Sequence, residues 1–293
     1  MDALITYVNG NDPHWQRTWT RSIGRPQAPN RFRDWGALPY LLRSIETFCP
    51  FIDKLFLVVS DEYQVPAFIN PETVRIVHHN AMIPAEYLPT FNSNVIEHFF
   101  HNIRALDEQF LYFNDDVFVN RPCTPEDFFS DGRIRASFIL RNESRTMYQQ
   151  FLHNASDLAH KAAGAQLPPM GQYYRCQHTV APLLKSLSSE LDGRLRTEMR
   201  PRLTRVRDWN NVTLTIFAIY GYLTGRAVDQ PLDGRYFSMA RETIAEAVEE
   251  LEHPTAATVC LNDLCKAEDF QDVRSMLHTE LQKKFPKKSR YEL

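Results

Sequence analysis

Short apolar runs separated by helical patterns are the feature that most constrains how this chain can fold. Apolar side chains recur at helical spacing from Leu38 to Phe48 and from Val95 to Ile103, with Ser93 as the expected cap of the second helix. Strands that alternate with helices predict an α/β fold, with a mostly parallel, Rossmann-like sheet and helices on both faces. The runs expected as buried strands are Ala3–Val8, Leu55–Val59, Val74–Val77, Phe110–Phe113, Ala136–Leu140 and Thr258–Leu261.

One long segment interrupts this alternation. From about residue 143 to residue 202 the clear strand runs stop, and the polar sequence predicts a helical cap or lid beside the sheet. We find no repeat and no low-complexity linker, so we expect one domain over residues 1–293.

Charge and composition exclude several classes of partner. The net charge is -3, which gives no overall attraction to nucleic acid, and no apolar run is long enough for a membrane-spanning helix. The start of the chain does not resemble a signal peptide, so we expect a cytoplasmic protein, with peripheral contact at the inner face of the membrane left open. The five cysteines form no close CxxC pair, which favours reduced structural thiols over metal ligation.

Polar clusters follow three of the expected strands, where open α/β sheets bind ligands. Asn9-Gly10-Asn11-Asp12 after the first strand predicts a turn, which is either an ordinary surface turn or a nucleotide-binding loop. Asn114-Asp115-Asp116 places two carboxylates at a buried strand end, where a divalent cation would offset their repulsion. Asn262-Asp263 repeats this pattern and could add metal or phosphate contacts.

Three other residues are weaker candidates from pattern alone. Glu97 lies off the apolar stripe of its helix, where a solvated carboxylate is the ordinary interpretation. His178 follows a loop that contains Gly and Tyr, and a lone histidine is usually structural. Arg207 closes an arginine-rich stretch in which most side chains are expected to be solvated.

Taken in order, these segments resemble the Stealth family, which includes bacterial capsular polysaccharide phosphotransferases and an animal N-acetylglucosamine-1-phosphotransferase. Four regions carry the resemblance, and they span nearly the whole chain. The matching segments are Leu4–Asp12; Arg31–Asp34, Leu42–Ile45, Leu88–Ser93, Ile96-Glu97 and Tyr112–Asp116; His178, Pro182 and Arg205–Arg207; and Val259–Asp263, Phe285-Pro286 and Ser289–Leu293.

The resemblance implies transfer of a hexose phosphate from a nucleotide sugar, expected to be UDP-linked, to the hydroxyl of a saccharide or polysaccharide acceptor. Nucleoside monophosphate would leave, and Mg²⁺ or Mn²⁺ would assist in capsule or exopolysaccharide synthesis. The implied catalytic residues are Glu97, Asp116, His178 and Arg207. Nucleotide-sugar contacts are expected from Asn9, Gly10, Asp12, Arg33, Asp34, Arg43, Asn92 and Asn114. Metal contacts are expected from Asp115, Asp116, Asn262 and Asp263.

Departures from the family pattern bear on the donor and the acceptor more than on the reaction. They stand at Tyr7, Trp35, Ala37, Pro39 and Asn211.

Two alternative functions remain at this point: a glycosyltransferase that releases a nucleoside diphosphate, and an inactive carbohydrate-binding protein. A binding protein would not need the four catalytic residue types that this chain retains.

Overall fold

A five-stranded sheet forms the centre of the molecule, with strand order β10-β4-β1-β2-β3, in a computed structural model that describes residues 1–26, 30–142 and 145–293. Neighbouring strands of this sheet are parallel except at its edge, where β10 runs antiparallel to β4. Its strands are β1 (Asp2–Thr6), β2 (Leu55–Val59), β3 (Val74–His78), β4 (Gln109–Phe113) and β10 (Ala181–Leu184).

Three smaller sheets complete the strand content of the described residues, with orders β12-β13-β5, β11-β7-β6 and β8-β9. Their strands are β5 (Val117–Val119), β6 (Phe129–Ser130), β7 (Arg133–Ala136), β8 (Ile139–Arg141), β9 (Tyr173–Arg175), β11 (Ala227–Asp229), β12 (Gly234–Met239) and β13 (Thr258–Asp263).

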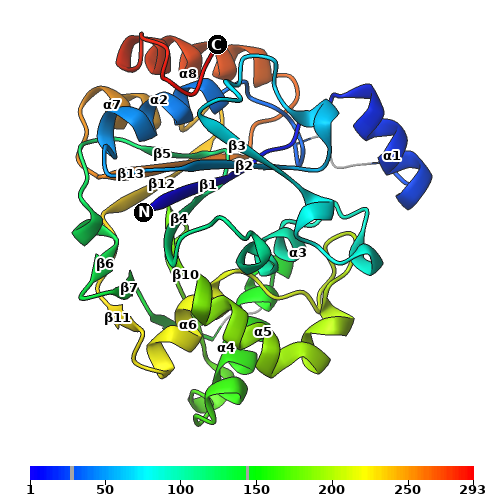
Figure 1. Cartoon of the computed structure of the whole chain (residues 1–293). Helices are drawn as coiled ribbons and strands as arrows, with labels where there is room; N and C mark the ends of the chain where they lie inside the picture. The colour runs from blue at the N-terminus through cyan, green and yellow to red at the C-terminus, as the bar shows by residue number, and fades with distance from the viewer. Residues whose placement is uncertain (27–29, 143–144) are drawn as a thin grey trace.

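Helices lie on both sides of the central sheet (Figure 1). In that view α2, α7 and α8 lie above the strands, while α3, α4, α5 and α6 gather below them. The helices are α1 (Pro13–Ile23), α2 (Leu38–Phe48), α3 (Ser93–His98), α4 (Met147–Ala163), α5 (Lys185–Met199), α6 (Thr215–Leu223), α7 (Ile244–Glu252) and α8 (Phe270–Lys284). None of them, over the residues described, has the length and apolar character that crossing a bilayer requires.

The apolar strand runs become central strands because both of their faces are covered. Every residue of β2 is buried, as are Ala3, Leu4 and Ile5 of β1. Burying one such aliphatic side chain stabilises the fold by about 1.5–3 kcal/mol. In the parallel register, Ile5 pairs with Leu57 on one side and with Phe113 on the other. The carboxyl ends of β1 and β4 therefore meet at one edge of the sheet.

The sheet β12-β13-β5 reaches the same edge. Cys260 of β13 pairs with Val117 of β5, and the Leu261 amide donates to the Asp116 carbonyl oxygen over 2.8 Å. These contacts tie the polar end of β13 to the turn that follows β4.

The α/β class with helices on both faces is confirmed, and four local expectations are corrected. The expected strand Ala136–Leu140 is divided between β7 and β8, which belong to different sheets. Asn92, not Ser93, caps α3, because its side chain accepts from the Asn94 amide. That helix ends at His98, and a 3-10 turn follows over Phe100–Asn102.

The fourth correction concerns the expected helical cap over residues 143–202. Residues 143 and 144 lie outside the described part of the chain, and α4 and α5 supply the helices. Between them, however, lie β9 and β10, and β10 pairs with β4 in the central sheet. The segment is therefore partly built into the sheet, because the short apolar run at Ala181–Leu184 covers the edge of β4.

Candidate active site

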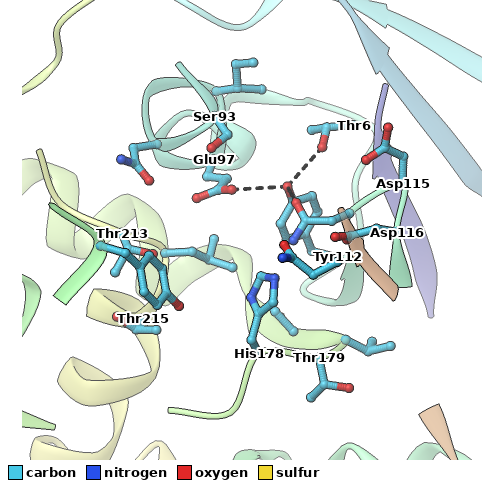
Figure 2. Close-up of a pocket in the computed structure, with 18 of the residues that line it drawn as sticks. Thr6, Ser93, Glu97, Tyr112, Asp115, Asp116, His178, Thr179, Thr213 and Thr215 are labelled. Carbon is cyan, nitrogen blue, oxygen red and sulfur yellow. Dashed lines mark hydrogen bonds between the residues drawn. The ribbon is translucent and has the colours of Figure 1, made fainter. Parts of the chain in front are cut away.

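A cavity of about 1400 Å³ opens at the carboxyl ends of β1 and β4, the edge that the strand pattern predicted. Its wall brings together Glu97, Asp116, His178 and Arg207, which come from four separate segments of the chain. Figure 2 shows His178 facing the space between Glu97 and Asp116, with Asp115 and Asp116 on the strand side. Asn114, Arg33, Asp34, Asn262 and Asp263 also line it.

The turn after β4 carries the negative charge of the cavity. Asp116 Oδ1 is buried and has no hydrogen-bond partner among the described residues, while Oδ2 lies 3.8 Å from the Cys260 thiol. Burial raises the pKa of Asp116, and the nearby His178 opposes that rise. Burial, together with the charges of Asp116 and Asp34, raises the pKa of Asp115 to about 8. A buried carboxylate oxygen without a partner, next to a second carboxylate, is a candidate for binding a cation, because a cation would offset the cost of their charges.

One group of side chains at this turn could hold a metal ion. Ligand atoms of Asp116, His178 and Cys260 lie within 4.8 Å of one another. The orphaned Asp116 oxygen fits a divalent cation, and Asp115 adds a second carboxylate to the cavity wall. Imidazole and thiolate are softer ligands than the oxygens that Mg²⁺ prefers, so this donor set also accommodates other divalent ions.

The end of β13 is arranged differently. Arg33 donates to both carboxylate oxygens of Asp263, from Nη2 over 2.6 Å and from Nε over 2.9 Å. The Cys265 amide donates to Asp263 Oδ1 as well. Asp263 is therefore neutralised by a bidentate ion pair, and its oxygens are already used. Asn262 and Asp263 lie in the cavity as predicted, but their metal role stays a prediction.

Glu97 is buried against a second polar network. The Tyr112 hydroxyl lies 3.2 Å from Glu97 Oε1 and 2.6 Å from Asn114 Oδ1, and Thr6 Oγ1 is 3.0 Å away (Figure 2). Burial raises the pKa of Glu97, and the charge of Arg207 opposes that rise. A phenol has one proton and cannot donate to both acceptors, so a protonated Glu97 would complete the network as a donor to Tyr112.

Arg207 is held at the first residue of α3. Its Nη2 donates to Ser93 Oγ over 2.9 Å, and its charge faces Glu97. The segment around it is fixed by the Phe91 amide, which donates to the Arg205 carbonyl, and by Asn92 Nδ2, which donates to Asn211 Oδ1. No carboxylate of the described chain forms an ion pair with Arg207 within 4 Å, so the guanidinium can accept an anionic ligand.

Five residues that the sequence placed in the nucleotide-sugar site do not line the cavity. Each of the five has a structural role outside the cavity wall. Asp12 caps α1, Asn92 caps α3, and Arg43 forms an ion pair with Glu292 near the end of the chain. Asn9 forms a local turn by accepting from the Asn11 amide, and a Cβ at Gly10 would lie 2.4 Å from the Phe32 carbonyl oxygen. Contact of these residues with a nucleotide remains a prediction.

Sequence reasoning missed other residues of the cavity wall. Tyr148, Arg175 and Tyr236 lie around His178, and no motif marks them. Cys260 was assigned only a structural thiol role, yet it lies beside Asp116; all five cysteines are buried and unpaired. The sequence signal that could have identified Cys260 as a site residue is its position directly before Leu261-Asn262-Asp263.

Sequence similarity to known proteins covers most of this chain. Residues 31–136 match the family model described as Stealth protein CR2, conserved region 2. The chain is 33% identical over 267 residues to the capsular polysaccharide phosphotransferase LcbA of Aeromonas hydrophila, covering 84% of this chain and 72% of that one. It is 27% identical to the capsular polysaccharide phosphotransferase WcwK of Streptococcus pneumoniae, covering 100% and 99%. Among solved structures, galactosyltransferase LgtC aligns over 94% of this chain and 95% of that chain, with 13% identity and a TM-score of 0.41.

Proposed function

Because this chain belongs to the Stealth family of polysaccharide phosphotransferases, we propose that it transfers a hexose 1-phosphate from a nucleotide sugar to a hydroxyl of a saccharide acceptor. The observation that carries this proposal is the convergence of Glu97, Asp116, His178 and Arg207 on one cavity. An unpaired arginine and unpaired carboxylates in one space suit a substrate that brings phosphate groups and a cation together.

In the proposed reaction the acceptor oxygen bonds to the phosphorus next to the sugar. The bond from that phosphorus to the bridging oxygen breaks, and nucleoside monophosphate leaves. The anomeric carbon is not attacked, so the sugar keeps its configuration. Such chemistry depends mainly on positioning and on charge stabilisation by the protein.

Each of the four residues has a role that follows from its surroundings. Arg207, oriented by Ser93, stabilises negative charge on the transferring phosphoryl oxygens. His178 takes the acceptor proton, because burial raises the pKa of Glu97 and leaves less of its carboxyl group ionised and able to accept a proton. Glu97 remains hydrogen-bonded to Tyr112, and its carboxyl group lies in the electrostatic field of Arg207.

Asp116 would hold a divalent cation, with Asp115 nearby and with His178 and Cys260 beside it. When bound, this ion, expected to be Mg²⁺ or Mn²⁺, would offset the charge of the diphosphate. Asp263 is less suited to this role because Arg33 occupies both of its oxygens.

The test is incubation with a panel of nucleotide sugars, Mg²⁺ or Mn²⁺ and saccharide acceptors, followed by mass analysis of the released nucleotide. We expect nucleoside monophosphate and a phosphodiester product. Release of nucleoside diphosphate would identify a glycosyltransferase instead. Nucleotide-sugar binding without any turnover would support an inactive carbohydrate-binding protein.

A further inference from the structure

Two exposed tyrosines flank His178 at the mouth of the cavity. Tyr148, in the first turn of α4, lies 6.4 Å from His178 between ring centroids, and Tyr236 of β12 lies 6.1 Å away. Both rings line the cavity, and their exposed fractions are 40% and 48%. Aromatic side chains that line a cavity and are partly open to solvent present a flat apolar face on which a ligand can pack.

The β8–β9 hairpin adds positive charge beside these rings. Ile139 pairs with Arg175, and Arg141 pairs with Tyr173. Directly paired residues and residues two apart lie on the same face of a sheet, so Arg141 and Arg175 share one face. Both arginines line the cavity and are exposed, and neither forms an ion pair within the described chain.

Arg175 lies close enough to both phenols to act on them electrostatically. Both rings are partly exposed, yet desolvation still raises the pKa of Tyr148 to about 12 and also raises that of Tyr236, and the charge of Arg175 opposes both shifts. We therefore treat as one continuous surface the rings of Tyr148 and Tyr236, the His178 imidazole and the Arg175 guanidinium.

We propose that Tyr148, Tyr236, Arg141 and Arg175 form the acceptor subsite, and that it selects a saccharide whose neighbouring linkage carries a phosphodiester. A hexose presents a face of C–H groups that packs on a phenol ring and would leave a hydroxyl directed to His178. The two arginines would pair with the anionic linkage next to that sugar. This inference rests on the proposed function, since that reaction makes one phosphodiester per turn and its product can return as acceptor.

Binding without donor tests the subsite independently of turnover. The probes are trimers of glucose, galactose and N-acetylglucosamine, each made with phosphodiester linkages and with neutral glycosidic linkages, and calorimetry gives Kd. We expect at least one phosphodiester trimer to bind the parent protein more tightly than its neutral counterpart. Tyr236→Ala should weaken it by about tenfold, and Tyr236→Phe should stay within about threefold, because the ring is retained.

Arg175→Gln should remove most of the preference for the phosphodiester trimer and reduce its salt dependence. The matched controls are Tyr222→Ala, an exposed tyrosine whose ring stacks on Phe138 outside the cavity, and Arg133→Gln on β7. Both controls should bind like the parent, and uridine monophosphate should bind equally to all variants.

The inference is overturned if no phosphodiester trimer binds the parent, if neutral trimers bind as tightly, or if the controls weaken binding as much as the subsite variants. A failure of the proposed function looks different. There, the trimers would bind with the expected pattern, yet no donor would release nucleoside monophosphate.

Discussion

The ends of β4 and β13 have similar sequences but opposite electrostatic environments. β4 is followed directly by Asn114-Asp115, and β13 finishes in Asn262-Asp263. Asp263 is held by Arg33 through both carboxylate oxygens, whereas Asp116, one residue beyond Asp115, keeps an oxygen without any partner in the described chain. The comparison teaches that a strand-end carboxylate indicates a ligand site only when the fold supplies no cation of its own.

The largest effect is expected at the β4 end. Asp116→Asn should lower kcat on the order of a thousandfold and weaken metal binding, because a neutral amide cannot offset the cation. Circular dichroism should show an intact fold, since Asp116 Oδ1 has no hydrogen-bond partner among the described residues. Kinetics over a metal titration provide the measurement, and full activity of the parent in a chelator would remove the metal from the mechanism.

The second prediction extends the comparison to the arginines. Arg33 is occupied by Asp263. Among the described residues, Arg207 donates to the neutral Ser93 hydroxyl and forms no ion pair within 4 Å, so it remains available for a phosphoryl group. Arg207→Ala should reduce kcat by about a hundredfold, which is the effect of losing one charged hydrogen bond in a dry site.

Its controls are Arg196→Ala and Arg200→Ala, which should stay within several-fold of the parent. Their side chains are 80% and 76% exposed, and their nearest acidic groups lie 3.9 and 4.0 Å away. If all three substitutions cause similar, salt-sensitive losses, the arginine-rich stretch acts as a collective basic surface and Arg207 has no catalytic role.

A third, smaller effect is expected at the β13 end. Asp263→Asn should lower the free energy of unfolding by about 2 kcal/mol, because a bidentate pair with little solvent exposure is lost. It should change kcat by less than about tenfold and leave metal affinity unaltered. Urea unfolding and a metal titration measure the two effects. A loss of metal affinity equal to that of Asp116→Asn would identify Asp263 as a metal ligand. The carboxylates at the ends of β4 and β13 would then have the same role.

The last effect is expected on stability and not on catalysis, as a pH dependence of unfolding in the presence of a chelator. Desolvation and neighbouring carboxylates raise the pKa of Asp115 to about 8, so the folded protein binds a proton that the unfolded chain releases near pH 4. The stabilising effect of that proton is present below pH 4 and is lost as pH rises to about 8.

Asp115→Asn should flatten this part of the profile, and adding Mg²⁺ should reduce the loss in the parent. Thermal unfolding from pH 4 to pH 8 is the measurement. An unchanged slope in the variant would show that another group titrates.

Several features of the site follow from the sequence because they depend on local pattern. Apolar runs define β1, β2, β4 and β13, and the polar residues after them lie at one edge because parallel strands end together. Glu97, His178 and Arg207 could be proposed only through the family resemblance, since no local pattern separates them from solvated or structural residues.

The sequence by itself determined the α/β class, the edge of the sheet that carries the site and the carboxylates at that edge. Tertiary structure decided which carboxylates are neutralised, because Arg33 and Asp263 are separated by 230 positions and meet only after folding. It also divided the run at Ala136–Leu140 and brought Tyr148, Arg175 and Tyr236 around His178. These outcomes depend on long-range packing and charge pairing, to which local periodicity is insensitive.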